Sequence, residues 1–343
     1  MPRSGEVSTA PGRRSVLVVW RHGTVDDAAR THHEAVLVER LRRLYRPFLG
    51  AGLTVTTRSA PAAGCTVAVV DECPGRTELR DVVIWGDPVG ATDPATVAEV
   101  RAALTDDIRC RDLLGSFVLL QMRDADVVLR TSSDLVHTLK HCSGPYGDAW
   151  ATQGFAALVA SGRRPSVVPE RVPEFVIYDF VFADDELLDG VRVLGEATSM
   201  RIAAHGAEET CYWPMSDRLR GGVGDAATLR AVLIDTLVRL TDRPGLHLAL
   251  TAGRDSTLLA GCLAEAGRSL PSFTFGNRRT ADGAGAAAVA AQLGWPHVFV
   301  GQQQDAAPSL DRLLAATRWS EGMDTAWNFY APPLDYSDVP ARA

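Results

Sequence analysis

Lysine is almost absent from this chain of 343 residues: Lys140 is the only one, and arginine supplies the rest of the 35 basic residues. No apolar run reaches the ~18 residues that a membrane-spanning helix needs, and the N-terminus lacks the apolar stretch of a signal peptide. The composition, with 46% hydrophobic and 22% charged residues, excludes a disordered or collagen-like chain. We therefore expect a cytoplasmic globular protein with no membrane partner.

Paired cysteine motifs and excess positive charge are also lacking. The absence of a CxxC pair predicts reduced structural thiols rather than a zinc site or a disulfide framework. The cysteines are Cys65, Cys73, Cys110, Cys142, Cys211 and Cys262. The 35 basic residues stand against 42 acidic ones, so the net charge is −7 and nucleic acid is not an expected partner.

The order of apolar runs and turn residues divides the chain into two parts. Residues 1–13 are polar and rich in Pro and Gly, which predicts a flexible tail. Residues 14–215 combine helical spacing with short strand-like runs, including two predicted hairpins that turn at 123–126 and at His205-Gly206. The glycines of 216–224 predict a linker. Residues 225–343 alternate helix and buried-strand patterns, which is typical of a parallel, doubly wound α/β sheet.

Individual elements are predicted within both parts. In the first part, an apolar run predicts the first strand at 15–20, and 173–182 predicts a short aromatic helix. In the second part, strands are predicted at 246–250, 272–275 and 297–300. An Ala-rich helix over 284–293 is expected to connect the last two strands.

The segment most informative about chemistry is 248–257, a buried-strand pattern that leads into a turn of small residues. A helix is expected to begin in this turn, so that backbone N–H groups and the hydroxyls of Thr251, Ser256 and Thr257 converge on an anion. A carboxylate beside phosphates is repulsive unless a cation bridges them, which gives Asp255 a role in holding Mg²⁺ on a triphosphate. The alternative is structural, because Gly, Ser and Asp are also ordinary turn and cap residues.

The TAGRDS segment at 251–256 resembles the SGGxDS pyrophosphate loop of the ATP-pyrophosphatase superfamily, and it is most similar to the asparagine synthetase-like family, which includes β-lactam synthetases and lasso-peptide cyclases. Weaker motifs agree with that family in order and spacing. They are LGSF at 114–117, LLDGVRVL at 187–194, YW at 212–213, SFTFG at 272–276 and LGWPH at 293–297. The resemblance implies an α+β glutaminase-like sandwich of the Ntn type, followed by an α/β doubly wound parallel sheet similar to the adenine nucleotide alpha hydrolases.

The sequence departs from the family pattern in three respects. Glutamine-using members attack glutamine with an N-terminal cysteine, whereas this chain starts Met1-Pro2 and has no cysteine before Cys65. We therefore expect 14–215 to form a degenerate class II glutaminase-like domain without glutaminase activity. Residues 225–343 are shorter than the family's synthetase domain, so a partial, truncated ATP-pyrophosphatase domain is expected. The family's late lysine is missing too, which leaves Arg254 and Arg278 as candidates to replace its charge.

The resemblance implies that ATP activates a carboxylate as an acyl-adenylate with release of pyrophosphate, after which an amine forms the amide. ATP and Mg²⁺ are the implied cofactors, and the expected substrate is a small acid or a peptide carboxylate. Catalytic roles fall to Asp255, which also holds Mg²⁺, and to Arg254. The cofactor-binding candidates are Thr251, Ala252, Gly253, Asp255, Ser256, Thr257, Phe275 and Gly276. Asp282 and Glu321 are candidate substrate or metal contacts, with solvated surface carboxylates as the alternative.

Two other functions stay open. One is a catalytically incomplete family member that binds nucleotide or a protein partner, where the partner supplies the missing C-terminal half. The other is a histidine phosphatase-like enzyme, because Arg21-His22-Gly23 follows the first predicted strand and an imidazole in that class accepts a phosphoryl group. His32 and His33 are expected to be solvated or capping residues, since neighbours on a helix point about 100° apart.

Overall fold

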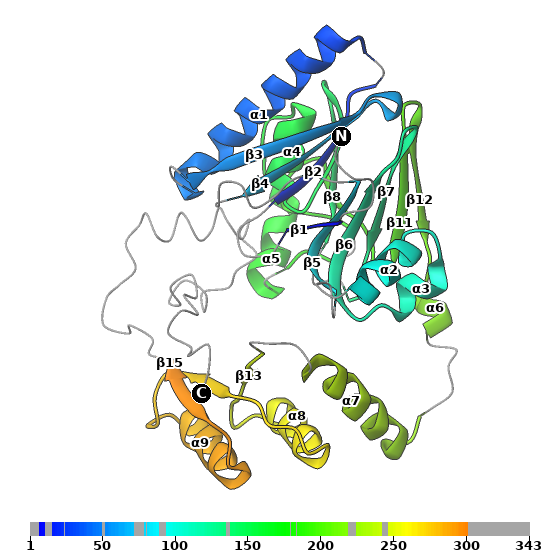
Figure 1. Ribbon diagram of the computed structural model, residues 1–343. Coiled ribbons are helices and arrows are strands. Elements are labelled where there is room, and N and C mark those ends of the chain that lie inside the picture. The colour runs from blue at the N-terminus through cyan, green and yellow to red at the C-terminus, as the bar shows by residue number, and fades with distance from the viewer. Residues whose placement is uncertain are drawn as a thin grey trace. The chain divides into compact units, whose positions relative to one another are not determined.

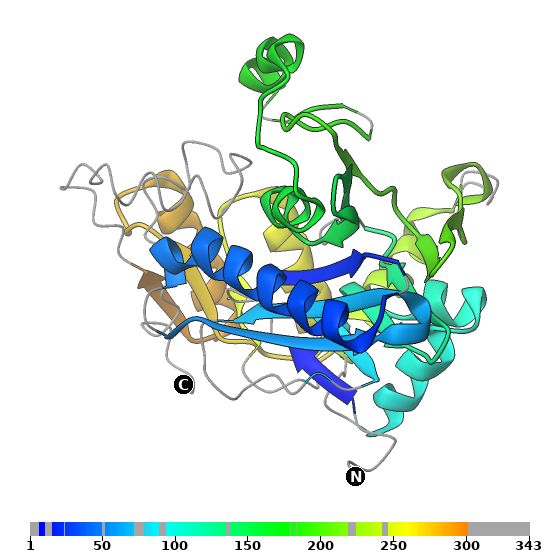
Figure 2. The same ribbon diagram turned by 90° about the horizontal axis from the view of Figure 1, so that it is seen from above.

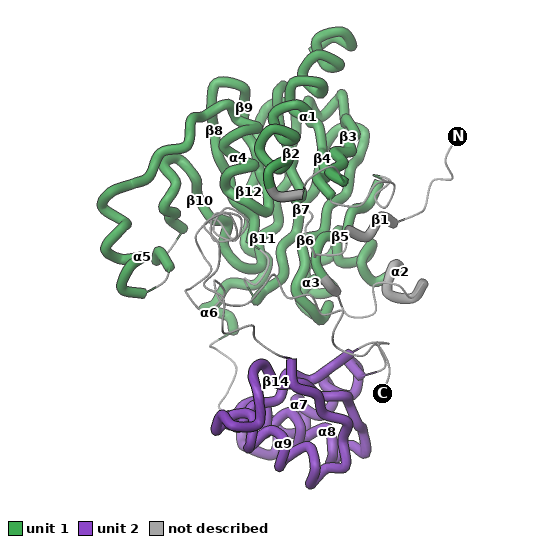
Figure 3. The backbone as a smooth tube through the Cα atoms, turned by 90° about the vertical axis from the view of Figure 1, so that its left-hand side faces the viewer, with its two compact units in different colours: residues 1–220, 319–323 green, residues 221–318, 324–343 purple. Residues whose placement is uncertain are grey.

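The computed structural model describes residues 7–10, 16–23, 25–49, 52–71, 79, 81–88, 94–134, 138–178, 180–182, 184–218, 224–241 and 246–300. The chain divides into two compact units (Figure 3), which we describe separately. Unit 1 comprises residues 1–220 with 319–323, and unit 2 comprises residues 221–318 with 324–343. In the part of the chain that is described, no helix is long and apolar enough to cross a bilayer.

Unit 1 is built on two six-stranded sheets, whose neighbouring strands are antiparallel except for the parallel pair β1 and β5. The first sheet has the order β1 (Val7–Ala10), β5 (Val82–Pro88), β6 (Gly115–Met122), β7 (Asp126–Thr131), β11 (Thr198–Ala203) and β12 (Gly206–Cys211). The second has the order β10 (Val191–Val193), β8 (Lys140–Gly144), β9 (Gly147–Ala151), β2 (Val16–Arg21), β4 (Cys65–Asp71) and β3 (Thr54–Ala60).

The two sheets face each other, and helices cover both outer faces (Figures 1 and 2). The alternation of side chains along each strand produces these layers. On β2, for example, Leu17 and Val19 lie in the core between the sheets, whereas Val16 and Val18 pack against helices. The second sheet is covered by α1 (Asp27–Leu49) and α4 (Gly154–Ser161), and the first by α2 (Pro94–Ala103) and α3 (Asp107–Asp112). Unit 1 is therefore a four-layer αββα sandwich, as the resemblance implied.

The predicted first strand and both predicted hairpins are present in unit 1. The strand expected at 15–20 is β2, and the hairpins are β6 with β7 and β11 with β12. The segment expected to be a tail is partly ordered, because Val7 to Ala10 form β1 and pair with β5 in the register Val7↔Val82. The composition of residues 1–13 did not predict this strand. Whether so short a segment becomes a strand depends on its partner, which here lies far along the chain.

The predicted aromatic helix is shorter than its pattern. It forms α5 (Val172–Tyr178), which follows the 3₁₀ turn η3 (Pro169–Arg171) and buries none of its residues. Phe180 and Phe182 lie beyond its end, with ring centroids 4.8 Å apart. A helix with no buried face gains little from a further turn, which accounts for the early end. Figures 2 and 3 show α5 projecting from the sandwich. Two more short elements are η2 (Pro61–Ala63) and α6 (Met215–Arg218).

The described cysteines are free thiols, as predicted. Cys65, Cys110, Cys142 and Cys262 are buried, whereas Cys211 is exposed, and Cys73 lies outside the described residues. Burial raises the pKa of the Cys65 thiol to about 12. A thiol with such a pKa is protonated and unreactive at neutral pH.

Unit 2 contains a small parallel sheet in the order β13 (Leu248–Ala249), β14 (Ser272–Phe275) and β15 (His297–Val300). Its helices are α7 (Ala226–Thr241), α8 (Arg254–Glu265) and α9 (Ala281–Leu293). The strands predicted at 272–275 and 297–300 are confirmed, and that at 246–250 is present but shorter. A doubly wound sheet reverses its strand order at a switch point. The three strands that are described follow chain order without a reversal, so the doubly wound arrangement remains a prediction.

Candidate functional site

The loop that follows β13 is held together by its own hydroxyl groups. The backbone N–H of Thr251 donates to Ser256 Oγ at 3.1 Å, and Thr251 Oγ1 lies 3.0 Å from the same Oγ. Thr251 Oγ1 also accepts the backbone N–H of Gly253 at 3.0 Å. Two of the three hydroxyls predicted to contact phosphate, those of Thr251 and Ser256, are thus brought together, and they fix the shape of the turn between the strand and the helix.

Helix α8 begins in this loop without a side-chain cap. Its N-cap is Gly253, with φ −68° and ψ 158°, and no side-chain cap bonds to the backbone N–H groups of the first turn. The backbone N–H groups of Arg254, Asp255 and Ser256 lie where a helix offers no acceptor of its own. Helix α9 differs, because Thr280 Oγ1 accepts the N–H of Gly283 at 3.0 Å. The start of α8 therefore presents free donors together with the positive end of the helix dipole, an arrangement that binds anions.

A cavity of about 860 Å³ lies beside this turn, wholly within unit 2. This volume falls within the ~300–1,000 Å³ typical of small-molecule sites. The lining residues come from one face of α7, from the loop and from α8. They are Ala226, Leu229, Arg230, Leu233, Ala252, Gly253, Arg254, Thr257, Leu258, Gly261, Cys262 and Glu265. Four of the predicted site residues, Ala252, Gly253, Arg254 and Thr257, thus line a single cavity.

The described lining of this cavity contains two arginines, Arg230 and Arg254. Arg230 is paired with Glu265 at 2.8 Å. Arg254 is exposed and forms no ion pair with any described residue. The second predicted cation, Arg278, lies over the ring of Phe299, 5.6 Å from its centroid. Among the described residues that line the cavity, Arg254 is therefore the one positive charge without an ion-pair partner in the described part of the chain.

Phe275 and Gly276 lie at the same edge of the sheet as the loop. The parallel register Ala249↔Phe273 places the carboxyl ends of β13 and β14 side by side. Phe275 is half-buried, with its ring 5.3 Å from that of Phe273. Gly276 has φ +105°, and its N–H donates to Val300 O at 2.9 Å, so its amide is already used. The ring of Phe275 is the part of this pair that a ligand can contact.

Helix α9 approaches the loop closely. A Cβ on Gly285 would lie 2.5 Å from the Cβ of Ala252, so a glycine at this position permits the approach. Asp282 precedes Gly285 by three positions and is exposed in the first turn of α9, on the same face of that helix. The helix that carries Asp282 therefore approaches the predicted loop at Gly285. Glu321 lies outside the described residues.

The contribution of α7 was missed by sequence reasoning. Leu229, Arg230 and Leu233 line the cavity from a helix that precedes the motif. Their spacing, together with Ala226, follows the i, i+3, i+4, i+7 pattern of one helix face. The spacing identifies one face of α7 but does not predict that this face lies opposite α8, because the two helices meet only in the folded unit.

The histidine phosphatase hypothesis placed the nucleophile at His22. Its Nδ1 lies 2.9 Å from Gly23 O and its Nε2 3.1 Å from Thr66 Oγ1, so both ring nitrogens have protein partners. Burial lowers the pKa of this imidazole. Arg21 forms an ion pair with Asp148. His22 therefore has no free ring nitrogen, and the neighbouring arginine is already paired.

The comparisons with known proteins find only distant structural likeness. No family model and no curated protein match the chain. One solved structure, described as the allosteric regulatory enzyme of purine biosynthesis, has a TM-score of 0.38 and 11% identity over 90% of this chain and 78% of that chain. A second, glutamine phosphoribosylpyrophosphate (PRPP) amidotransferase from B. subtilis complexed with ADP and GMP, has a TM-score of 0.37 and 10% identity over 83% of this chain and 65% of that chain. Likeness at this level assigns neither a sequence family nor an activity.

Proposed function

We propose that this chain uses ATP to join a carboxylate to an amine through an acyl-adenylate, with the triphosphate bound at the start of α8. The observation that carries this proposal is the uncapped first turn of α8 beside a cavity of about 860 Å³. Phosphate oxygens are strong acceptors for the N–H groups of such a turn. The resemblance of the TAGRDS segment to a pyrophosphate loop supports the same assignment.

Asp255 supports a role for Mg²⁺ at this site. Its carboxylate is exposed in the first turn of α8 and bonds to no residue that the structure describes. Among the described residues, no group of three or more metal-ligating side chains is present. Mg²⁺ suits such a site, since it commonly takes one or two carboxylates and completes its coordination with phosphate oxygens and water. The ion would also remove the repulsion between Asp255 and a triphosphate.

Arg254 and Phe275 complete the proposed nucleotide site. Arg254, which has no ion-pair partner among the described residues, would neutralise negative charge that develops on the α-phosphate and the leaving pyrophosphate. The half-buried ring of Phe275, at the same edge of the sheet, would contact the adenine. Asp282, exposed on the neighbouring face of α9, would contact the acid or amine substrate.

We also propose that the amine does not come from glutamine hydrolysis in unit 1. Of the four described cysteines of that unit, Cys65, Cys110 and Cys142 are buried, whereas Cys211 is exposed on β12, far along the chain from the N-terminal position of the family's nucleophile. Burial raises the pKa of each of the three buried thiols. A nucleophilic cysteine needs the opposite shift, toward a thiolate.

The reaction can be tested through its nucleotide products. We expect the purified chain, incubated with ATP, Mg²⁺ and a panel of carboxylic acids and amines, to release AMP and pyrophosphate in equal amounts, dependent on one acid. An acyl-adenylate requires this stoichiometry, which chromatography of the nucleotides together with a pyrophosphate assay measures. Acid-dependent formation of ADP and phosphate would contradict the proposal, because it indicates a carboxyl phosphate.

Two observations favour a second function, nucleotide binding by a chain that needs a protein partner for catalysis. Within the described residues, β13 lies at the edge of its sheet, and α7 buries none of its side chains. An open strand edge and an unburied helix are surfaces that another chain can cover. Saturable Mg²⁺·ATP binding without AMP formation from any acid or amine would favour this function over catalysis by the chain alone.

A further inference from the structure

A second cavity, of about 540 Å³, lies entirely within unit 1. It is formed by the end of β2, one face of α1 and the turn between β8 and β9. The lining residues are Trp20, His22, His32, His33, Val36, Arg40, Pro145, Tyr146 and Gly147. The cavity plays no part in the nucleotide proposal, because that site belongs to unit 2.

The turn between β8 and β9 forms a fixed wall of this cavity. Trp20 Nε1 donates to Tyr146 O at 2.9 Å, which ties the turn to β2. A Cβ on Gly162 would lie 1.8 Å from the Tyr146 ring, so that ring rests directly on the backbone at the end of α4. Gly147, with φ +111°, brings its backbone against Arg21 O.

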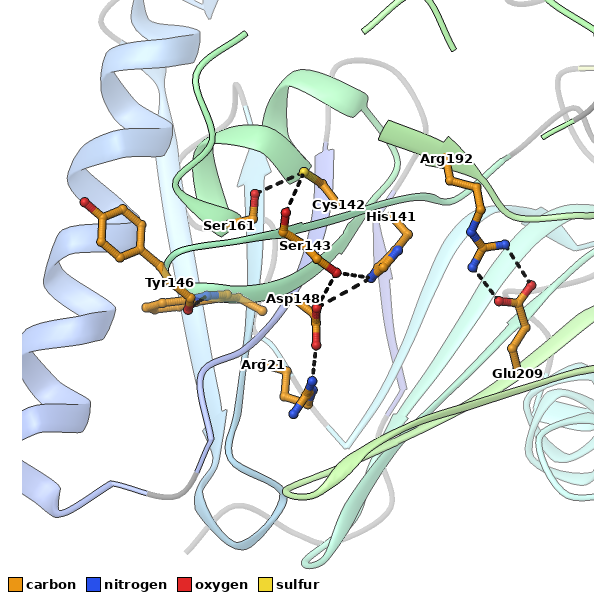
Figure 4. A network of polar contacts seen from close by, with 10 residues as sticks. Arg21, His141, Cys142, Ser143, Tyr146, Asp148, Ser161, Arg192 and Glu209 are labelled. Carbon is orange, nitrogen blue, oxygen red and sulfur yellow. Dashed lines mark hydrogen bonds and ion pairs between the residues drawn. The ribbon is translucent and has the colours of Figure 1, made fainter. Parts of the chain in front are cut away.

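A polar network holds the other side of the same turn (Figure 4). Arg21 forms an ion pair with Asp148, whose second carboxylate oxygen accepts the Ser143 hydroxyl at 2.6 Å. His141 lies 3.8 Å from the same carboxylate. Figure 4 shows the Tyr146 ring on the side of the turn that faces α1, away from this network. The aromatic wall is therefore held in place independently of any ligand.

Arg40 gives the cavity its charge. Its guanidinium lies 4.0 Å from the centroid of the Tyr146 ring and forms no ion pair with any residue that the structure describes. None of the lining residues is acidic. The neighbouring carboxylates of α1 have other partners, since Glu34 bonds to Ser59 and Glu39 pairs with Arg43. A guanidinium that is stacked on a ring and lacks a counter-ion is well suited to a carboxylate or phosphate.

Flat rings make up much of the remaining wall. The rings of Trp20 and His22 are 5.0 Å apart, those of Trp20 and His33 are 5.6 Å apart, and those of His22 and His33 are 5.4 Å apart. Such a cluster offers edges and faces against which another flat ring packs favourably. The volume falls within the ~300–1,000 Å³ range of small-molecule sites and is too small for a folded partner.

We propose that this cavity binds a small aromatic acid, with its carboxylate or phosphate on Arg40 and its ring among Trp20, His33 and Tyr146. The unpaired guanidinium selects the charge, and the cluster of indole, imidazole and phenol rings selects the flat group. The proposal stands apart from the nucleotide site in unit 2, so either can fail without the other.

Calorimetric titration of the full chain with four probes tests the proposal in the absence of ATP. We expect benzoate and phenyl phosphate to bind saturably, and acetate, which lacks the ring, and benzamide, which lacks the charge, to bind at least about tenfold more weakly. Equal binding of benzoate and benzamide would overturn the role of Arg40. Equal binding of benzoate and acetate would overturn the role of the rings. No saturation by either aromatic acid at about 10 mM would overturn the site itself.

Two arginine substitutions on α1 supply the matched control. Arg40→Gln should weaken benzoate binding at least about tenfold, while Arg43→Gln should leave it within about twofold. Arg43 lies on the same helix, and its side chain is 79% exposed and paired with Glu39. Arg40→Lys keeps the charge and guards against a folding defect, because it should retain more benzoate affinity than Arg40→Gln. Equal losses in Arg40→Gln and Arg43→Gln, with native circular dichroism in both, would overturn the assignment.

Discussion

Replacing Asp255 with asparagine should change ATP affinity in opposite directions with and without Mg²⁺. With excess Mg²⁺, we expect the dissociation constant for ATP to rise at least about tenfold, because the exposed carboxylate in the first turn of α8 no longer helps to hold the ion. In EDTA, we expect the variant to bind ATP roughly twofold more tightly than the parent chain, because a negative charge beside the phosphates has been removed. Calorimetry in the two buffers measures both effects.

The control for this substitution is Asp235→Asn. Asp235 is exposed on α7 of the same unit rather than in the first turn of α8, so its loss changes the net charge equally without removing a carboxylate from the proposed phosphate site. We expect its ATP affinity to match that of the parent chain in both buffers. A uniform change in both variants would indicate a general charge effect, and an Asp255→Asn variant that binds Mg²⁺·ATP normally would remove Asp255 from the site.

Gly147→Ala should be among the most destabilising single substitutions in unit 1. Gly147 has φ +111°, which side-chain-bearing residues rarely adopt, and a Cβ there would lie 2.1 Å from Arg21 O. Because the clash is with backbone, a side-chain rotation cannot relieve it. We expect the free energy of unfolding to fall by about 3–5 kcal/mol. Denaturant unfolding followed by circular dichroism measures the loss.

Gly206→Ala provides the comparison for that measurement. Gly206 begins β12, its φ is not in the left-handed region, and an added Cβ would meet nothing within 4 Å. We expect a change within about 0.5 kcal/mol, as for an ordinary surface substitution. If the two alanine variants unfold at the same denaturant concentration, the turn between β8 and β9 is not the fixed wall that the second cavity requires.

Much of the fold could be predicted because its signals are local. The continuous apolar run of β2 predicts a strand that is buried on both faces, and in the structure Val16 and Val18 face helices while Leu17 and Val19 face the other sheet. The bounds of β14 and β15 were predicted to the residue, because each strand is a short apolar run of consecutive residues. The pyrophosphate-like loop was found because its residues are consecutive, and the structure places Ala252, Gly253 and Thr257 around one cavity.

The remaining features depend on contacts between distant segments. The strand Val7–Ala10 was missed because its pairing with β5 joins residues far apart in sequence. The cavity of unit 1 could not be predicted either, since Trp20, Arg40 and Tyr146 come from a strand, a helix and a distant turn. The hydroxyls of Thr251 and Ser256 were expected to face a phosphate, but whether they bond to each other depends on the exact shape of the loop.

The amide signals of Arg254, Asp255 and Ser256 provide the sharpest test of the nucleotide site. In a nuclear magnetic resonance titration with Mg²⁺·ATP, we expect these three backbone N–H groups to shift together and saturably, because the phosphates supply the acceptors that the uncapped turn lacks. The N–H of Gly283, already bonded to Thr280 Oγ1 at 3.0 Å, serves as the internal reference and should move little. Unchanged signals from the start of α8 with ATP in large excess would contradict the proposed nucleotide site.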